Sequence, residues 1–215
     1  MSNKKVIIVD YNSGNIGSVI NMFKYIGVDA ELTNDPDEIR NAERLILPGV
    51  GNFSYGMKQL EDSGLIPILN DVVLNKKTPI LGICLGAQLM TLKSEEGMVN
   101  GLGWLDAVVE KFKFSSEENI KLPNIGWRDI SIEKESILFN NMYANPRFYF
   151  VHSYRMNSNN TKDVLAKSSY NIDFTAALEK ENIYALQFHP EKSHKYGLEV
   201  FKNFVNIQNK FKWVE

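Results

Sequence analysis

Short runs of consecutive apolar residues alternate with helical patterns through the first half of the chain, and this alternation constrains the fold more than any other feature. Residues 6–9, 44–47 and 79–83 fit strands that are buried on both faces. Apolar residues recur at helical spacing from Ile16 to Phe23, and again over residues 65–74. Because parallel strands need crossover connections, the pattern predicts βαβ units and an α/β fold with a mostly parallel central sheet and helices on both faces.

The second half of the chain has short strand-like pieces separated by turns. These pieces lie at residues 104–109, 129–132, 148–154, 174–178 and 183–188, and residues 179–182 fit a hairpin connection. An amphipathic helix is expected over residues 196–211, where it buries Val200, Phe204 and Ile207. The sequence has no repeat and no linker, so residues 1–215 are expected to form a single domain with antiparallel additions in its second half.

Composition narrows the setting in which the chain works. Its net charge of -2 gives no basic field for nucleic acid. No apolar run approaches the roughly 18 residues of a membrane span, and the N-terminus does not fit a secretory signal. The single cysteine among 215 residues excludes an internal disulfide and favours a reducing compartment. We therefore expect a cytoplasmic protein that binds neither nucleic acid nor a membrane.

The segment Gly82-Ile83-Cys84-Leu85-Gly86 lies between an expected strand and an expected helix. A nucleophile flanked by glycines in this way can project above the sheet from a sharp turn. The start of a helix also stabilises a thiolate, and the backbone N–H of Leu85 is placed to stabilise an oxyanion. A lone cysteine is otherwise a small buried hydrophobe. The strand–turn–helix setting favours the nucleophile.

A second candidate segment, Gln187-Phe188-His189-Pro190-Glu191, follows an apolar strand near the end of the chain. Open α/β sheets place their ligands at the carboxyl ends of such strands. In an extended chain, the side chains of His189 and Glu191 point to the same side. The carboxylate can then orient the imidazole while the other ring nitrogen serves Cys84. Cys84, His189 and Glu191 are accordingly the expected catalytic residues, although a histidine at a strand end is often structural.

Further segments fall in suggestive places around these residues. The glycines of Pro48-Gly49-Val50-Gly51 would let backbone N–H groups face a developing oxyanion, or they form a plain turn. Gln88 lies one helical turn after Cys84 and could contact the substrate, or it is simply an exposed polar residue. Residues 93–96, Lys-Ser-Glu-Glu, are expected to form a solvated face.

The sequence lacks the usual motifs for nucleotide cofactors and zinc. It has no P-loop and no G-x-G-x-x-G segment, so no nucleotide cofactor is expected. The three histidines, His152, His189 and His194, and the single cysteine do not fit the spacing of a zinc site. We therefore expect neither a metal nor another cofactor.

Taken together, the motifs resemble the class I glutamine amidotransferases, whose pattern has a cysteine elbow and a late His-Pro-Glu. The resemblance runs almost from end to end, and within the family it is strongest to the glutaminase subunits that serve histidine biosynthesis. The segments that carry it are Gly14-Asn15, Pro48 to Gly51, Gly82 to Gln88, Ile125-Gly126-Trp127, Tyr149 to Tyr154 and Gln187 to Ser193.

This resemblance implies a reaction and a partner. The Cys84 thiolate would attack the side-chain amide of glutamine, with backbone groups of Gly49, Val50 and Leu85 holding the oxyanion. His189 would protonate the departing ammonia, and water would then release glutamate from the thioester. Residues expected to hold the glutamine are Gln88, His152, Ser153 and Tyr154. The ammonia would pass to a (β/α)8 barrel cyclase or synthase subunit in a heterodimer, with Asn15, Trp127, Tyr149 and Lys192 facing or steering that partner.

The chain departs from the family pattern at one segment. The family usually reads Pro-His-x-Gly-Trp-Asn, where this chain has Asn124 and Arg128 in place of the histidine and the final asparagine. We expect this change near the partner surface, which leaves open a paralogous glutaminase that feeds a sugar-amidating synthase for surface polysaccharide. A catalytically inactive scaffold subunit is the alternative of another class. A cysteine peptidase or chaperone-like protein fits less well, because such proteins usually have a histidine at the position of Leu85.

Overall fold

Five parallel strands form one half of a large sheet in the computed structural model, which describes residues 5–114 and 120–208. Neighbouring strands follow the order β2 (Asp29–Thr33), β1 (Lys5–Val9), β3 (Leu45–Leu47), β4 (Ile80–Ile83) and β14 (Ile183–Leu186). Every pairing among them is parallel. The predicted parallel sheet is therefore confirmed, and β4 and β14, which precede Cys84 and His189, are direct neighbours within it.

Antiparallel strands extend the sheet beyond β14, as the second half of the sequence predicts. The sheet continues through β13 (Ile172–Lys180), β11 (Tyr154–Ser158), β7 (Ala107–Lys111), β5 (Lys93–Ser94) and β6 (Val99–Asn100), and β12 (Val164–Tyr170) and β9 (Ser131–Ile132) branch from β13. Among these pairings only β5 with β7 is parallel. A separate ribbon pairs β8 (Asn124–Asp129) with β10 (Arg147–His152). The expected hairpin also forms, because β13 pairs with β14 up to Lys180 opposite Ile183.

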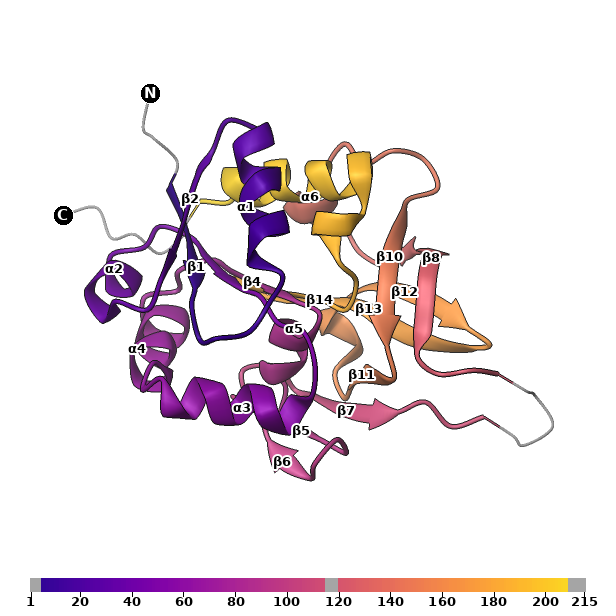
Figure 1. Cartoon of the computed structure of the whole chain (residues 1–215). Coiled ribbons are helices and arrows are strands. Elements are labelled where there is room, and N and C mark those ends of the chain that lie inside the picture. Colours follow the sequence, from indigo (N-terminus) through magenta and orange to yellow (C-terminus); the bar gives the residue numbers. More distant parts are fainter. Residues whose placement is uncertain (1–4, 115–119, 209–215) are drawn as a thin grey trace.

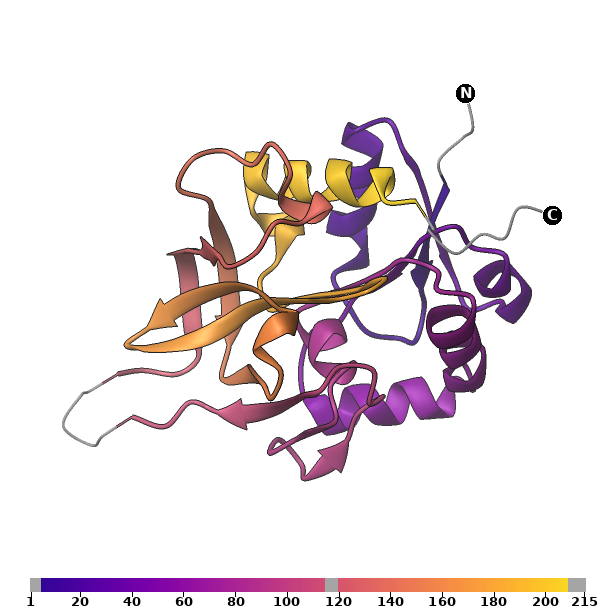
Figure 2. The same ribbon diagram turned by 180° about the vertical axis from the view of Figure 1, so that it is seen from behind.

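Helices cover both faces of the parallel strands (Figure 1). One face carries α1 (Ile16–Tyr25) and α6 (His194–Asn206), and the other carries α2 (Pro36–Arg40), α3 (Phe53–Asp62), α4 (Ile66–Asn70) and α5 (Leu85–Leu89). Alternate residues of β1 serve the two layers. Val6 and Ile8 belong to the core beneath α1 and α6, whereas Ile7 and Val9 belong to the core beneath the other helices. The view from behind in Figure 2 shows the same two layers.

Several predicted elements have different bounds in the structure. The helix expected at residues 65–74 is α4 followed by a π-helical turn, η1 (Asp71–Asn75). The final helix begins earlier than expected, at His194, and ends at Asn206, and residues 209–211 of the prediction lie outside the described residues. Three 3-10 turns complete the elements: η2 (Ile137–Phe139), η3 (Thr161–Asp163) and η4 (Pro190–Lys192).

The strand expected at residues 148–154 is interrupted at Ser153. Its first part, β10, pairs with β8 in the small ribbon, whereas β11 joins the large sheet. The break places His152 and Tyr154 at the boundary between the two sheets. No helix in residues 5–114 or 120–208 has the length and apolar character needed to cross a membrane.

Candidate active site

Cys84 lies in a strained turn between β4 and α5. Its φ of 51° is in a region that non-glycine residues rarely adopt, and its backbone N–H donates to the Leu186 carbonyl oxygen at 2.7 Å. The flanking glycines are required by space. A β-carbon on Gly82 would lie 2.7 Å from the α-carbon of Ala87, and one on Gly86 would lie 1.9 Å from the Leu47 carbonyl oxygen. The predicted nucleophile elbow is confirmed as a backbone structure.

The Pro48-Gly49-Val50-Gly51 loop lies against this elbow. A β-carbon on Gly49 would come within 2.5 Å of the Gly86 backbone nitrogen. The hydroxyl of Tyr11, which is fully buried, donates to the Pro48 carbonyl oxygen, and burial raises the pKa of this phenol. The Val50 N–H points to Ser13 Oγ at 3.5 Å. The loop therefore adjoins Cys84, with the Val50 donor occupied by a long, weak contact.

His189 and Glu191 form a buried pair after the neighbouring strand. His189 Nδ1 lies 2.7 Å from Glu191 Oε1, and the residues are only 1% and 9% exposed. The two side chains were expected to meet along an extended chain. They meet instead because Pro190–Lys192 forms the 3-10 turn η4. The backbone N–H of His189 donates to the Tyr149 carbonyl oxygen at 2.9 Å, which fixes this segment against β10.

The second imidazole nitrogen, Nε2 of His189, is buried and has no hydrogen-bond partner among the described residues. Burial alone would lower the pKa of His189, but the charge of Cys84 and a hydrogen bond to its sulfur, followed by Glu191, raise this pKa to about 10. The Cys84 sulfur therefore lies near Nε2, but the geometry between the two atoms is too poor for a regular hydrogen bond. Such loose contacts are usual for catalytic pairs without substrate. The structure thus brings Cys84, His189 and Glu191 together.

A pocket of about 390 Å³ opens beside this pair. Nine of the residues predicted from the sequence line it: Val50, Cys84, Leu85, Gln88, His152, Ser153, Tyr154, His189 and Lys192. Gly49 and Glu191 do not line the pocket, but Gly49 lies against Gly86 and Glu191 contacts His189. Four further residues line the pocket: Gly51, which lies in the predicted Pro48 to Gly51 loop, and Glu96, Pro123 and Val151, which were not predicted as site residues.

Glu96 corrects the expectation that residues 93–96 form a solvated face. Ser94 is 2% exposed and lies in β5, and Glu96 Oε2 accepts the Phe53 N–H at 2.8 Å. Glu96 thereby binds the start of α3 while it lines the pocket. A run of charged residues hid these contacts, because the pairing of β5 with β7 is long-range.

Gln88 is buried, with 4% of its surface exposed. The alternative prediction, that Gln88 is simply an exposed polar residue, is therefore wrong. Its Nε2 donates to the Tyr154 carbonyl oxygen at 3.2 Å and to Gln187 Oε1 at 3.0 Å. Both hydrogens of the amide are therefore used, and the carbonyl oxygen remains as an acceptor. The thiol of Cys84 has the Val151 carbonyl oxygen 3.9 Å away.

Three of the four residues expected at the partner surface share one cluster. The Trp127 ring stacks on His194 with centroids 5.5 Å apart, and its edge meets Tyr149 at 6.3 Å. Lys192 Nζ lies 5.8 Å from the centre of the Tyr149 ring. The fourth, Asn15, precedes α1, and its Oδ1 accepts a hydrogen bond from Ser18 Oγ at 3.2 Å. The aromatic rings are half-buried, so part of each remains exposed.

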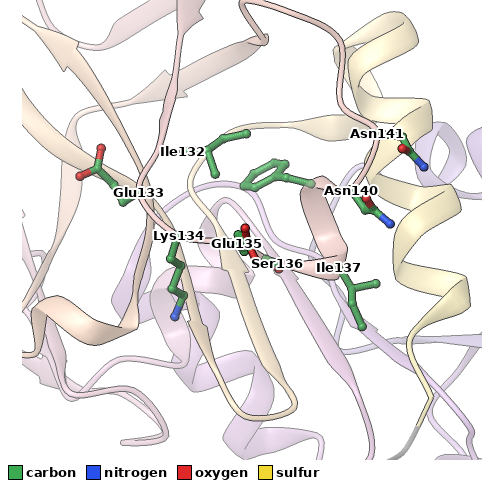
Figure 3. A pocket seen from close by; sticks show the side chains of 9 residues that line it. Ile132, Glu133, Lys134, Glu135, Ser136, Ile137, Asn140 and Asn141 are labelled. Carbon is green, nitrogen blue, oxygen red and sulfur yellow. The ribbon is translucent and has the colours of Figure 1, made fainter.

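A larger hollow of about 840 Å³ lies away from this chemistry, around η2 (Figure 3). It is lined by residues 132–137 together with Phe139, Asn140 and Asn141. The ammonium group of Lys134 is already bound to the carbonyl oxygens of Lys162 and Glu179. Within residues 5–114 and 120–208, no group of three or more His, Cys, Asp or Glu side chains is placed to hold a metal ion.

Comparisons with known proteins place the chain in a family. The family model described as glutamine amidotransferase class-I matches residues 7–207. The imidazole glycerol phosphate synthase subunit HisH 2 of Methanococcus maripaludis is 48% identical over 93% of this chain and 98% of its own length. The HisH 2 subunit of Pseudomonas aeruginosa is 43% identical over 94% and 99%.

The fold agrees with this sequence relationship. The crystal structure of a glutamine amidotransferase superposes with a TM-score of 0.72 at 18% identity and covers 93% of this chain and 96% of that chain. The matched segment includes the cysteine elbow, the pocket and the His189–Glu191 pair. The chain therefore belongs to the class I glutamine amidotransferase family, among the HisH subunits of imidazole glycerol phosphate synthase.

Proposed function

We propose that residues 1–215 form a single cytoplasmic glutaminase domain, which hydrolyses glutamine and supplies ammonia to a cyclase subunit of imidazole glycerol phosphate synthase in histidine biosynthesis. The observation that carries the mechanism is the buried His189–Glu191 pair, 2.7 Å apart, beside the strained Cys84 in a pocket of about 390 Å³. The names of the relatives support the pathway. The geometry of the pocket supports the chemistry.

The reaction proceeds in two steps through a thioester. The Cys84 thiolate adds to the side-chain amide carbon of glutamine and forms a carbon–sulfur bond. The His189 imidazolium gives its proton to the amide nitrogen, ammonia leaves, and a glutamyl thioester remains. The neutral imidazole then takes a proton from water, which attacks the thioester and releases glutamate and the Cys84 thiolate. Glu191 orients the imidazole and stabilises its cation throughout both steps.

Backbone N–H groups stabilise the oxyanion of each tetrahedral intermediate. Leu85 is the first residue of α5. Its N–H is available to an oxyanion, because the first N–H groups of a helix have no partner within the helix. Gly49 and Val50 supply further groups from the neighbouring loop. Because the Val50 N–H points to Ser13 Oγ in this structure, it must turn before it can serve. Turnover of glutamine by the isolated chain is therefore expected to be low until a partner reorients the loop.

The glutamine is held by Gln88 and by the residues between β10 and β11 that line the pocket. Gln88 offers its carbonyl oxygen, because Tyr154 and Gln187 fix its amide nitrogen. His152, Ser153 and Tyr154 line the same pocket where β10 gives way to β11. Backbone and side-chain groups from this break contact the α-carboxylate and α-ammonium groups of the substrate.

The partner is a (β/α)8 barrel subunit that receives the ammonia. Asn15, Trp127, Tyr149 and Lys192 face or steer it, and the half-buried rings of Trp127 and Tyr149 supply the kind of aromatic surface that protein interfaces favour. The sugar-amidating alternative differs only in this partner and in its product. Co-purification of the partner, followed by an assay for imidazole glycerol phosphate, separates the two.

Replacement of the nucleophile tests the proposal. In the complex with its cyclase partner, Cys84→Ala should abolish synthesis that depends on glutamine, while synthesis from added ammonium salt should continue at the wild-type rate. Persistent use of glutamine by this variant would contradict the mechanism. Loss of both activities together with a normal complex would show that Cys84 has another role. A wild-type chain that binds the barrel but never hydrolyses glutamine would support the inactive scaffold.

A further inference from the structure

Four residues form an ordered chain of hydrogen bonds at the pocket, where His152 and Tyr154 belong to the lining and Asn124 and Arg128 do not. Arg128 Nε donates to Asn124 Oδ1 at 3.1 Å, and Asn124 Nδ2 lies 3.1 Å from His152 Nε2. His152 Nδ1 then lies 2.8 Å from the carbonyl oxygen of Tyr154. Asn124 and His152 face each other in the register of β8 and β10. Asn124 is fully buried against His152, so this departure from the family pattern lies behind the pocket and not at the partner surface.

The donors and acceptors in this chain permit only one arrangement. A guanidinium can only donate, so the oxygen of the Asn124 amide must face Arg128 and its NH2 group must face His152. A carbonyl oxygen can only accept, so His152 carries its proton on Nδ1 toward Tyr154. Nε2 then accepts from Asn124. Protonation of His152 on both nitrogens would place two donors against each other.

The surroundings of His152 also favour the neutral imidazole. The rings of Phe112, Phe150 and Phe174 lie within 5.6 Å of it, measured between ring centroids. The pKa of His152 is lowered to about 4, chiefly by burial; the hydrogen bond to Tyr154 opposes this shift, and the charges of His189 and Arg128 contribute to it. Arg128 itself is held by the Tyr170 ring, with its guanidinium carbon 4.6 Å from the ring centre.

The hydrogen-bond chain reaches the glutamine pocket because two of its members share one acceptor atom. The Tyr154 carbonyl oxygen accepts both from His152 Nδ1 and from Gln88 Nε2. Gln88 in turn donates to Gln187, whose Nε2 lies 4.0 Å from the Cys84 sulfur. We propose that Arg128 and Asn124 are positioning residues, which lock His152 as the neutral Nδ1–H tautomer and thereby fix the wall that binds glutamine.

Nitrogen-15 NMR of the imidazole rings tests the tautomer in the full chain. In the wild type, His152 should show a protonated Nδ1 and a bare Nε2 at pH 7, with the signal assigned by its loss in His152→Gln. In Asn124→Asp, a carboxylate oxygen replaces the NH2 group that faces Nε2 and can accept a hydrogen bond from an Nε2–H, so both nitrogens of His152 should be protonated. A wild-type Nε2–H tautomer, or an Asn124→Asp spectrum identical to that of the wild type, would overturn the proposal.

Steady-state kinetics of the complex test the consequence for substrate binding, which rests on the proposed glutaminase function. Arg128→Met removes the donor but retains apolar bulk over Tyr170. The loss of one oriented hydrogen bond should raise KM for glutamine about threefold to tenfold. The value of kcat should change less than twofold, and activity with ammonium salt should not change. Arg40→Gln, which removes an exposed arginine of α2, is the matched control and should leave KM unchanged.

The NMR measurement and the kinetic measurement test different claims, so one can contradict its claim while the other supports its own. A wild-type complex with its cyclase partner that has no glutaminase activity would refute the proposed function, whereas the NMR result would still decide whether the hydrogen-bond chain exists. If Asn124→Asp does not fold, Arg128→Met carries both tests, because loss of the Arg128 charge should raise the pKa of His152. An unchanged KM together with an unchanged His152 titration in Arg128→Met would refute the positioning role.

Discussion

The Leu47 carbonyl oxygen lies against Gly86 so closely that a β-carbon on this glycine would be 1.9 Å away from it. This approach joins the end of β3 to the first turn of α5, directly beside Cys84. The pocket therefore lies just beyond the carboxyl ends of the parallel strands β3 and β4, where open α/β sheets place their ligands.

Gly86→Ala should therefore destabilise the protein, because neither backbone can move without displacing a strand. We expect a loss of about 3 kcal/mol or more in the free energy of unfolding, measured in urea. Gly17→Ala is the matched control, since Gly17 lies in α1 and a β-carbon there meets nothing within 4 Å. That variant should gain about 0.4–1 kcal/mol. Equal stabilities of the two variants would contradict the close approach.

Glu191→Gln should impair turnover while it preserves the shape of the site. Glu191 helps to raise the pKa of His189, and a neutral amide cannot stabilise the imidazolium. We expect kcat for glutamine to fall roughly 10²–10⁴-fold, the usual contribution of a positioned acid or base. Synthesis from ammonium salt by the same complex provides the control. A variant with full glutamine activity would remove Glu191 from the mechanism.

Cys84→Ser should lower the pKa of His189 from about 10. Cys84 is the largest influence that raises this pKa, whereas burial, which lowers it, remains in the variant. Titration of the imidazole by NMR measures the change, and the wild-type value belongs to the Cys84–His189 pair and not to the histidine alone. If His189 titrates at the same pH in both proteins, the sulfur and the imidazole are not coupled.

His152 should make the fold sensitive to mild acid. Its folded pKa of about 4 lies below the ordinary value of 6.5, so the folded state binds fewer protons than the unfolded state between these values. The stability that depends on neutral His152 is present above pH 6.5 and is lost as the pH falls toward 4. The wild type should lose about 3 kcal/mol more between pH 7 and pH 4 than His152→Gln does. Parallel losses in urea unfolding would show that His152 is freely protonated.

Trp127→Ala should weaken binding of the barrel partner. Large aromatic residues at the centre of an interface typically cost about 2 kcal/mol or more when they are truncated. Calorimetric titration with the partner should therefore show Kd raised at least about thirtyfold. Tyr25→Ala, at an exposed position at the end of α1, should leave Kd unchanged. An unchanged Kd for Trp127→Ala would place the interface elsewhere.

Much of the fold could be predicted because its central strands are buried on both faces. Residues 6–9, 44–47 and 79–83 therefore appear as apolar runs, and the structure has β1, β3 and β4 there. The edge strand β2 (Asp29–Thr33) was not predicted, since it carries Asp29 and Glu31 and has no fully buried residue. The strand β12 was also missed. Its pairing with β13 contains register shifts, and its apolar run is short, because polar residues follow directly after Val164 to Ala166.

The candidate site could be predicted where a motif is local. The elbow around Cys84 and the His189–Glu191 pair each lie within five consecutive residues. The glycines on both sides of Cys84 indicate a sharp turn, and the two-residue spacing of His189 and Glu191 indicates a contact between their side chains. Glu96 and Val151 reach the pocket only because particular loops and strands become neighbours, which a single sequence does not indicate. For the same reason, Asn124 was expected at the partner surface. It is buried because its register partner across the β8–β10 ribbon is His152.

Covalent capture of the nucleophile tests the central claim most directly. A chloroketone analogue of glutamine should label the chain in the complex, and peptide mapping should place the adduct on Cys84, the only cysteine. His189→Gln should react at least about tenfold more slowly, because the imidazole no longer holds the thiolate. An unlabelled Cys84 in the complex, or the same labelling rate without His189, would contradict the account.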